Sequence, residues 1–429
     1  MTHGFSKTFY NLAVPIAVAG GYVATVFHAK LRQAAAGRRG WRKRWTDAAA
    51  RLAERPVWFH VSSVGEFEQA KPVITALRET YANIPVVVSF SSPSGYEFAL
   101  RKETLYDNNN IKFVDYLPVD LARNSRFCLQ TIAPRLLVFV KFDLWPNLIW
   151  EARRRSIPTV LIDATLSPSS RRNSGLGRSF YRSVYASIGR ILAISESDAA
   201  RFRDTVPDHP SISFAGDTRF DRVLERKRLA GDIGFDFDRR DRKIVVCGST
   251  WPRDEAHLLP ALSALMDAHS DLYAIIAPHE PLPERIDELS RWARSSDLSI
   301  GYVSKGVADP PPRVLLVDTI GILAEVYRLG DAAYIGGAFS TGVHSVIEPA
   351  IEGMPVVFGP LHDNSYEALR MTEADAAFCV RDAQDVCVQL ERLLYDDDSR
   401  AKAGDAARRY VDSQLGATEK SMAVIAEYL

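Results

Sequence analysis

Cysteine is scarce in this chain, and net charge is absent. Of the 429 residues only four are cysteine, and no two of them form a CxxC pair, which argues against a zinc site and against a disulfide framework. They are Cys128, Cys247, Cys379 and Cys387. All four lie in apolar or helical runs, so we expect buried, inert thiols in a reducing compartment.

Basic and acidic residues number 53 each, so no global positive field indicates a nucleic-acid partner.

Acidic residues are missing from the N-terminal region before Asp47, and residues 12–27 carry no charge of either sign. This apolar stretch is shorter than the ~20 residues that span a bilayer comfortably. Its basic cluster follows it, whereas a cleaved signal peptide carries basic residues first. The cluster comprises Lys30, Arg32, Arg38, Arg39, Arg42, Lys43 and Arg44. We interpret residues 1–45 as an anchor on the anionic cytoplasmic surface of a membrane; a buried N-terminal helix is the alternative.

The rest of the chain alternates short apolar runs with helical patterns, without an internal repeat or a low-complexity segment. The apolar runs are rich in Val, Ile and Phe and predict strands. A first series covers 57–61, 85–90, 111–117, 136–142, 159–163, 191–194 and 211–215, and a second covers 244–247, 272–277, 300–303, 314–317, 332–335, 356–358 and 378–380. The intervening segments have apolar residues at helical spacing. This order predicts an α/β fold with doubly wound parallel sheets.

Two domains are expected from the length of the chain. Residues 221–243 are dense in charge and poor in long apolar runs, as in a linker. We therefore predict an N-terminal Rossmann-like domain at 46–225 and a C-terminal one at 226–429 that ends in a helical tail. Two such domains facing a central cleft resemble the glycosyltransferase B fold, an arrangement shared with epimerases and periplasmic-binding-type proteins.

The stretch from Ile335 to Pro360 is the most informative part of the sequence. It predicts a strand end, a glycine-rich loop, a helix of about two turns and a second strand. The glycines, which let backbone N–H groups approach an anion, are Gly336, Gly337 and Gly342. Glu348 in the first helical turn suits a ribose diol, and His344 would share its helical face. An ordinary crossover is the alternative, but His344 and Glu348 favour a nucleotide-sugar site.

Two further strand ends of the C-terminal domain carry candidate donor-binding residues. Ser249 and Thr250 offer hydroxyl and N–H donors to a phosphate, although a simple helix cap is the alternative. His279, with Arg285 a few residues on, follows the next strand and is a candidate contact for the phosphate or the departing nucleotide. A local hydrogen-bond role is the more common use of a lone histidine.

The N-terminal domain has polar groups at two strand ends. Glu66 is the candidate general base, and capping of the following helix is the alternative role of the same loop. The neighbouring candidates for acceptor binding are Ser62, Ser63 and Gly65. Lys141 and Asp143 would share a face if their strand extends that far. They are candidates for an anionic or polyhydroxylated acceptor, or else form a structural ion pair.

In their order along nearly the whole chain, these segments resemble the Kdo transferases, the 3-deoxy-D-manno-octulosonic acid transferases of lipopolysaccharide assembly. Each segment alone is weak evidence for the family, but the shared order of all of them along the chain is specific to it. The segments read FYNLAVPI, HVSSVGEFEQAKPVI, LWPN, PTVLIDATLS, ILAISESDAARF, AGDTRFDRV, GSTWPRDE, IIAPHE and GVHSVIEPAIEGMPVVFGP.

The resemblance implies a metal-independent, inverting enzyme without cofactor. It would move Kdo from CMP-Kdo to a lipid A precursor, lipid IVA, at the cytoplasmic face of the inner membrane. Glu66 matches the glutamate of the SVGE motif and is implied to be the base that activates the acceptor hydroxyl. His344 and Glu348 match the nucleotide-binding GxHxxxEP motif. The phosphate loop GST is matched by Ser249 and Thr250, and the glycines ahead of the histidine by Gly336, Gly337 and Gly342.

The chain departs from the family pattern at three places. Ser345 stands where Asn usually follows the motif histidine, Lys141 replaces a carboxylate, and PHEPLPER stands where many members read PRHPER. A glycosyltransferase of the same architecture with a UDP-sugar donor, such as a lipid disaccharide synthase, is the closest alternative. A non-catalytic sugar-nucleotide-binding scaffold on the membrane is the alternative from another class.

Overall fold

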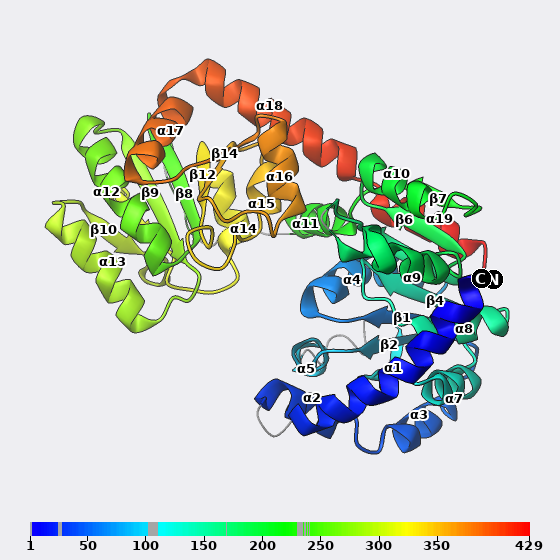
Figure 1. Ribbon diagram of the computed structural model, residues 1–429. Helices are drawn as coiled ribbons and strands as arrows, with labels where there is room; N and C mark the ends of the chain where they lie inside the picture. The colour runs from blue at the N-terminus through cyan, green and yellow to red at the C-terminus, as the bar shows by residue number, and fades with distance from the viewer. Residues whose placement is uncertain are drawn as a thin grey trace. The chain divides into compact units, whose positions relative to one another are not determined.

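The computed structural model describes residues 2–24, 28–101, 110–168, 170–229, 235, 237, 239 and 241–429 (Figure 1). The chain forms two compact units. The first consists of Met1–Arg222 together with Gln414–Leu429, and the second of Val223–Ser413. Each unit is an α/β domain built on one seven-stranded parallel sheet, so the predicted fold class is confirmed at this level.

The sheet of the first unit has the order β3-β2-β1-β4-β5-β6-β7. Its strands are β1 Val57–Val61, β2 Val86–Phe90, β3 Ile111–Tyr116, β4 Leu136–Val140, β5 Thr159–Ala164, β6 Arg190–Ala193 and β7 Ile212–Phe214. Every residue of β1, β2, β4 and β5 is buried, as expected where helices cover both faces of a parallel sheet. All seven predicted strands of this series are present, with ends shifted by one or two residues.

The sheet of the second unit has the order β10-β11-β9-β8-β12-β13-β14. Its strands are β8 Lys243–Thr250, β9 Leu272–Pro278, β10 Ile300–Tyr302, β11 Val314–Leu316, β12 Ala332–Ile335, β13 Val356–Phe358 and β14 Ala377–Cys379. The second predicted series is therefore also confirmed. β8 extends three residues beyond its apolar run, because Ser249 forms a bulge with a positive φ of 53° before Thr250 pairs with Pro278.

Helices connect the strands of both sheets. In the first unit these are α1 Thr2–Ala24, α2 Ala29–Gly37, α3 Trp41–Ala49, α4 Val64–Thr80, α5 Pro93–Arg101, α7 Ala122–Ile132, α8 Pro146–Arg154, α9 Gly175–Tyr185, α10 Glu196–Thr205 and α19 Ala417–Ala426. In the second unit they are α12 Pro252–Ala268, α13 Pro283–Ser295, α14 Leu323–Val326, α15 Ile347–Ile351, α16 Tyr366–Glu373 and α17 Ala383–Tyr395. Two helices, α11 Thr218–Leu229 and α18 Asp397–Gln414, run across the boundaries of the units. Three 3-10 turns lie at Arg171–Asn173, Val303–Lys305 and Tyr327–Leu329.

Alternate residues of β1 pack into separate cores on the two faces of the first sheet. Trp58 belongs to the cluster that contains Trp45 and Phe139, whereas Phe59 belongs to the cluster that contains Phe67. All five are fully buried. The period of two along the strand therefore fixes which side chains lie on each face.

Each sheet has one switch point, where the strand order reverses direction. In the first sheet it lies between β1 and β4, and in the second between β8 and β12. Open parallel sheets bind ligands outside the carboxyl ends of the strands at this point. The ends of these four strands and the segments that follow them carry the candidate site residues, except His279 and Arg285, which follow β9.

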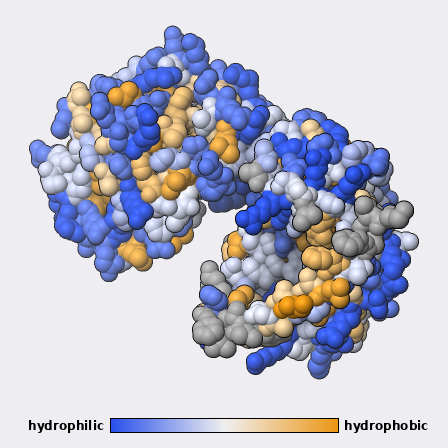
Figure 2. All heavy atoms as spheres, in the orientation of Figure 1, coloured by the Kyte–Doolittle hydropathy of each residue, from blue (hydrophilic) through white to orange (hydrophobic). Residues whose placement is uncertain are grey.

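The N-terminal helix α1 lies on the first unit with part of its surface uncovered. Tyr10 packs edge-on against Trp150 and beside Phe180. On other turns Phe9, Leu12 and Ile16 are 62%, 68% and 75% exposed, and Figure 2 shows apolar side chains along this helix. Among the described residues, no helix has the length and apolarity required to cross a membrane. Residues 25–27 of the predicted apolar stretch lie outside the described residues.

Two arginines of the predicted basic cluster are used inside the fold. Arg44 binds the carboxylate of Asp115 through two nitrogens, each at 2.8 Å. Arg38 donates to the carbonyl oxygens of Leu117 and Ser91, also at 2.8 Å. These two side chains therefore stabilise the packing of α2 and α3 on the domain.

The structure differs from the sequence analysis at the predicted linker, at the C-terminus and at two cysteines. The charged segment begins as helix α11 rather than as an irregular linker. The end of the helical tail, Gln414–Leu429, belongs to the first unit, because apolar side chains such as Ile425 join its core. Cys128 and Cys247 are buried as expected, but Cys387 on α17 is only partly buried. Cys379 is exposed, since β14 is an edge strand.

Candidate functional site

Glu66 lies in the first turn of α4, directly beyond β1, and is 3% exposed. The hydroxyl of Ser62 donates to its Oε2 at 2.5 Å, and the N–H of Ser62 donates to the same oxygen. Ser63 is the N-cap of α4, and its Oγ accepts the N–H of Glu66 at 3.3 Å. Burial raises the pKa of Glu66, while the two bonds from Ser62 oppose the rise. The loop therefore caps the helix and holds a buried, more basic carboxylate at the switch point.

A buried histidine connects this loop to the neighbouring strand. His60 Nδ1 lies 2.9 Å from the hydroxyl of Ser89, which also accepts the Nε1–H of Trp58 at 2.8 Å. On its other side His60 Nε2 lies 3.4 Å from Asp143 Oδ2. Trp145 Nε1 also donates to that oxygen, at 3.1 Å. No role was predicted for His60 from the sequence, although it lies on β1, the strand that leads into the loop before Glu66.

Asp143 and Lys141 do not form the geometry that an extended strand would give. β4 ends at Val140, and Lys141 has a positive φ of 64°, so the two side chains are not on one strand face. Asp143 is bound to His60, whereas the ammonium group of Lys141 lies over the ring of Phe142. Burial alone would raise the pKa of Asp143, but the nearby His60 ring and the hydrogen bonds from Trp145 and Ser91 outweigh it and leave the pKa lowered.

The glycine loop beyond β12 is tied to the loop beyond β8 by a buried carboxylate. Asp254 is 0% exposed and accepts the N–H groups of Gly337 at 2.8 Å, Trp251 at 3.0 Å and Phe339 at 3.1 Å. Burial raises its pKa, and these backbone N–H groups oppose the rise. The sequence analysis missed Asp254, because its position three residues into a helix is also that of an ordinary cap.

The three glycines of the loop have acceptors inside the protein. Besides the bond from Gly337 to Asp254, the N–H of Gly336 donates to the carbonyl of Gly248, and that of Gly342 donates to the carbonyl of Gly337, both at 2.9 Å. A Cβ on Gly336 would lie 2.2 Å from the carbonyl oxygen of Ser249. Glycine is therefore required where the two loops touch.

Ser249 and Thr250 differ in what their hydroxyl groups contact. The Thr250 hydroxyl is buried and donates to Glu255 Oε1 at 2.7 Å. Ser249 lies partly exposed in the bulge of β8. Arg285 forms ion pairs with Glu255 and Glu288.

His344 and Glu348 are four residues apart but do not share a helical face. α15 is only five residues long and begins after His344. The reason is that the N–H of His344 donates to the carbonyl of Gly336 at 3.1 Å, outside any helix. Glu348, the candidate for nucleotide binding, accepts a hydrogen bond from the hydroxyl of Ser345. Ser345 is the residue that stands where asparagine usually follows the motif histidine.

A cluster of three aromatic rings lies beyond the carboxyl ends of β8, β9 and β12. His279 stacks on Trp251, with ring centroids 4.7 Å apart, and on His344, at 4.3 Å. The predicted candidates His279 and His344 are therefore brought together, and Trp251, which the sequence analysis did not select, joins them.

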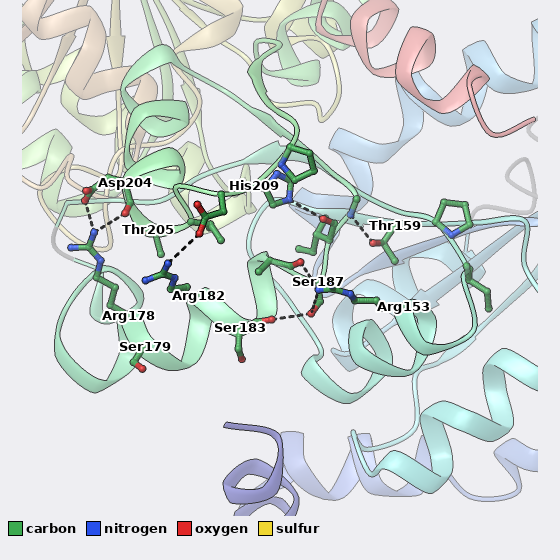
Figure 3. A pocket seen from close by; sticks show the side chains of 18 of the residues that line it. Arg153, Thr159, Arg178, Ser179, Arg182, Ser183, Ser187, Asp204, Thr205 and His209 are labelled. Atoms are coloured by element: carbon green, nitrogen blue, oxygen red, sulfur yellow. Dashed lines mark hydrogen bonds and ion pairs between the residues drawn. The ribbon is translucent and has the colours of Figure 1, made fainter. Parts of the chain in front are cut away.

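A pocket of about 1140 Å³ lies elsewhere in the first unit (Figure 3). Its walls include Thr159, the first residue of β5, and Gly189 just before β6, so it opens at the amino ends of these strands. Arg178 on its wall is paired with Asp204 at 2.7 Å. Because Glu66 follows the carboxyl end of β1, this pocket is not the candidate active site.

A fold of two doubly wound parallel sheets defines a two-domain α/β protein, and the switch points carry a buried carboxylate in one unit and a glycine loop with imidazoles in the other. Comparisons with known proteins identify the family. Residues 38–222 match the family model described as 3-Deoxy-D-manno-octulosonic-acid transferase (kdotransferase). The chain belongs to the family of 3-deoxy-D-manno-octulosonic acid transferases and is a glycosyltransferase, as the sequence motifs predicted.

Relatives match over most of their length. The 3-deoxy-D-manno-octulosonic acid transferase of Bordetella pertussis is 30% identical over 389 residues, which cover 87% of each chain. The enzyme of the same name from Chlamydophila psittaci is 29% identical and covers 80% of this chain and 78% of its own. The one from Haemophilus influenzae is 25% identical, with 87% of each chain covered.

Solved structures of other proteins share the fold. The UDP-GlcNAc 2-epimerase of Neisseria meningitidis, bound to UDP-GlcNAc, aligns with a TM-score of 0.60 and 13% identity over 87% of this chain and 100% of its own. A UDP-N-acetylglucosamine 2-epimerase from Listeria monocytogenes, described as putative, gives 0.59 and 13% over 88% and 97%. At this identity the likeness shows the architecture alone.

Proposed function

We propose that this glycosyltransferase moves Kdo, with inversion, from CMP-Kdo to the lipid A precursor lipid IVA in lipopolysaccharide biosynthesis. The observation that carries the proposal is Glu66, a buried carboxylate at the switch point of the first sheet with a raised pKa. The names of the relatives supply the sugar. CMP as the leaving nucleotide and the lipid acceptor rest on the sequence motifs.

The proposed chemistry is an in-line displacement with Glu66 as the general base. Its carboxylate takes the proton of the acceptor hydroxyl as that oxygen bonds to the anomeric carbon of Kdo, and the bond from this carbon to the phosphate oxygen breaks, so that CMP leaves with the electron pair. Both bonds from Ser62 reach Oε2, which leaves Oε1 for the proton. A raised pKa strengthens the base at neutral pH.

The donor nucleotide is assigned to the loops of the second unit. The partly exposed Ser249, the imidazoles of His279 and His344, and the carboxylate of Glu348 are the proposed contacts for phosphate and ribose. Thr250 and the glycines hold the loops in position, since Thr250 is bonded to Glu255 and the glycines pair within the fold.

The acceptor is assigned to the first unit, on the loop with Ser62, Ser63 and Gly65 and on the turn with Lys141 and Asp143. The exposed apolar side chains of α1 are proposed to rest on the cytoplasmic face of the inner membrane. We propose the glycosyltransferase B arrangement for the two units, because the reaction requires both switch points to reach the same pair of substrates.

The test is a transfer assay with CMP-Kdo and a tetraacylated lipid A precursor, with products counted by mass spectrometry. Glu66→Gln removes the base but keeps the size of the side chain, and we expect transfer to fall at least ~100-fold while CMP binding persists. Glu68→Gln on the same helix, whose carboxylate pairs with Lys71, is the matched control and should transfer at a rate close to that of wild type.

Three outcomes would contradict the proposal in different ways. Near-normal transfer by Glu66→Gln would remove Glu66 as the base. A wild-type enzyme that uses a UDP-sugar and not CMP-Kdo would exclude the proposed donor. Absence of CMP release when both substrates are supplied would favour a binding role instead of catalysis.

A further inference from the structure

The rings of Trp251, His279 and His344 are arranged so that their contacts determine which nitrogen of His344 carries a proton. The rings of Trp251 and His344 are nearly parallel, with an interplanar angle of 9°, and they meet edge to edge. The indole Nε1 of Trp251 lies 2.8 Å from Nε2 of His344. His279 covers both rings, inclined by 25° to Trp251 and by 18° to His344.

The contact between Trp251 and His344 permits one protonation state. An indole N–H can only donate, so Nε2 of His344 must accept and carries no proton. A neutral imidazole then has its single proton on Nδ1. A positively charged His344 would place two N–H groups against each other at this distance, so the geometry also excludes the imidazolium form.

We propose that Trp251 is a positioning residue that fixes His344 in the tautomer with its proton on Nδ1, so that the ring offers the donor nucleotide a neutral N–H. The proposal rests on the proposed function only in taking the nucleotide as the ligand of His344. A neutral donor suits a carbonyl oxygen of the base or a phosphate oxygen, and it keeps the same charge across the physiological pH range.

The surroundings of the ring support this state. Burial lowers the pKa of His344 to about 4, and His279 adds to the effect. Titratable groups on the same segments have other contacts: Asp254 accepts the N–H of Trp251, Glu348 is bonded to Ser345, Glu255 pairs with Arg285, and Arg253 is exposed. A Cβ on Gly337 would lie 2.7 Å from the His344 ring, so the glycine loop holds the ring against Trp251.

The first experiment needs no variant. In the full chain labelled with 15N-histidine, the nitrogen shifts of His344 report which ring nitrogen is protonated, and the His344→Gln spectrum assigns the signals. We expect Nε2 without a proton from pH 5.5 to 8. A proton on Nε2, or an ordinary histidine titration in this range, would overturn the proposal.

The second experiment removes the indole N–H together with the five-membered ring that carries it. In Trp251→Phe a smaller aromatic ring remains but Nε2 of His344 loses its donor, so His344 should titrate at higher pH than in wild type. A charged His344 binds an anion more strongly than a neutral one. Relative to wild type, CMP affinity of the variant should therefore gain about fivefold to tenfold between pH 8 and pH 5.5, as measured by calorimetry.

Trp292→Phe is the matched control, because Trp292 donates its Nε1–H to Ser263 at 3.1 Å and has no contact with the three rings in the described structure. It should leave the nitrogen shifts and the pH dependence of CMP binding unchanged. Equal pH dependence in wild type and Trp251→Phe would count against the proposal. Failure of wild type to bind CMP, with the expected nitrogen shifts, would instead contradict the proposed function and leave the tautomer assignment standing.

Discussion

The hydroxyl of Thr218 donates to Oδ2 of Asp163 at 2.8 Å, so a buried carboxyl is tied to the first residue of α11. The same hydroxyl lies 2.7 Å from the carbonyl oxygen of Gln69, which can only accept. The Thr218 hydroxyl therefore has two acceptors, Asp163 and Gln69, for its single proton. Burial, together with the nearby charge of Asp217, raises the pKa of Asp163 to about 8.

This protonated carboxyl predicts a fall in stability with rising pH. In the unfolded chain an aspartate titrates near 3.9, so between about pH 4 and pH 8 the folded state binds more protons than the unfolded state. Its contribution to the free energy of unfolding is complete below pH 4 and is lost as pH rises toward 8. Asp163→Asn has nearly the same shape and does not titrate, so its free energy of unfolding should lack this fall.

Urea unfolding at several pH values measures the effect, with Asp267→Asn on α12 as a control, whose carboxylate is exposed. The difference in unfolding free energy between wild type and Asp163→Asn should change steadily from pH 5 to pH 8 in favour of the variant. A difference that is constant over this range would show that Asp163 is ionised in the fold.

Asp254 gives a second prediction, on the loops of the second unit. Its two oxygens accept three backbone N–H groups, and Asp254→Asn replaces one of these oxygens with a donor. At least one buried N–H then loses its acceptor, which costs about 1–3 kcal/mol of unfolding free energy. CMP affinity should fall at least ~tenfold as the glycine loop shifts.

Asp287→Asn on α13 is the control for this change, because Asp287 is exposed and a surface substitution of this kind changes stability by less than ~0.5 kcal/mol. Calorimetry of CMP binding and thermal unfolding report the two effects separately. Unchanged affinity in Asp254→Asn, despite lower stability, would mean that the glycine loop does not determine nucleotide binding.

The strands could be predicted from the sequence because each is a short run of buried Val, Ile and Phe whose identity needs no tertiary information. Strand ends were less accurate where the backbone turns with positive φ, as at Lys141 and Ser249. Those two residues are not glycine, so the sequence gives no local sign of the turn. The C-terminal helix α19 was predicted in the C-terminal domain but packs in the first unit, because an apolar face alone does not show which core it joins.

Candidate site residues could be selected from the sequence because they follow predicted strands, and parallel strands place the residues that follow them at one edge of the sheet. Their partners could not be selected. Asp254 and Gly337 are 83 residues apart, and Trp251 and His344 are 93 apart, so only the packing of the two loops shows that they touch. The predicted shared face of His344 and Glu348 failed because backbone bonds across the sheet edge replace the first helical turn.

The exposed apolar side chains of α1 predict membrane binding. Replacing Phe9, Leu12 and Ile16 with serine removes most of the apolar area that could enter a bilayer surface. We expect partitioning onto vesicles with anionic lipids to fall at least ~tenfold, as measured by cosedimentation. The fold should survive, because these side chains are more than half exposed.

A triple serine variant of exposed apolar residues in the second unit, Leu282, Ile320 and Val388, is the matched control. It removes comparable apolar area and should bind vesicles like wild type. Equal loss in both variants would indicate nonspecific adhesion, and no loss in the α1 variant would remove this helix as the membrane contact.

The pH dependence of transfer gives a final prediction, in which two substitutions act in opposite directions on one group. The acid limb of kcat/KM reports the pKa of the base in the free enzyme. The charge of Asp143 raises the pKa of Glu66, whereas the hydrogen bonds from Ser62 lower it. Asp143→Asn should therefore shift the acid limb to lower pH, and Ser62→Ala should shift it to higher pH, whatever each does to the maximal rate. Ser94→Ala, in the first turn of α5, should leave it in place. Shifts of the same sign in the first two variants would show that a group other than Glu66 titrates.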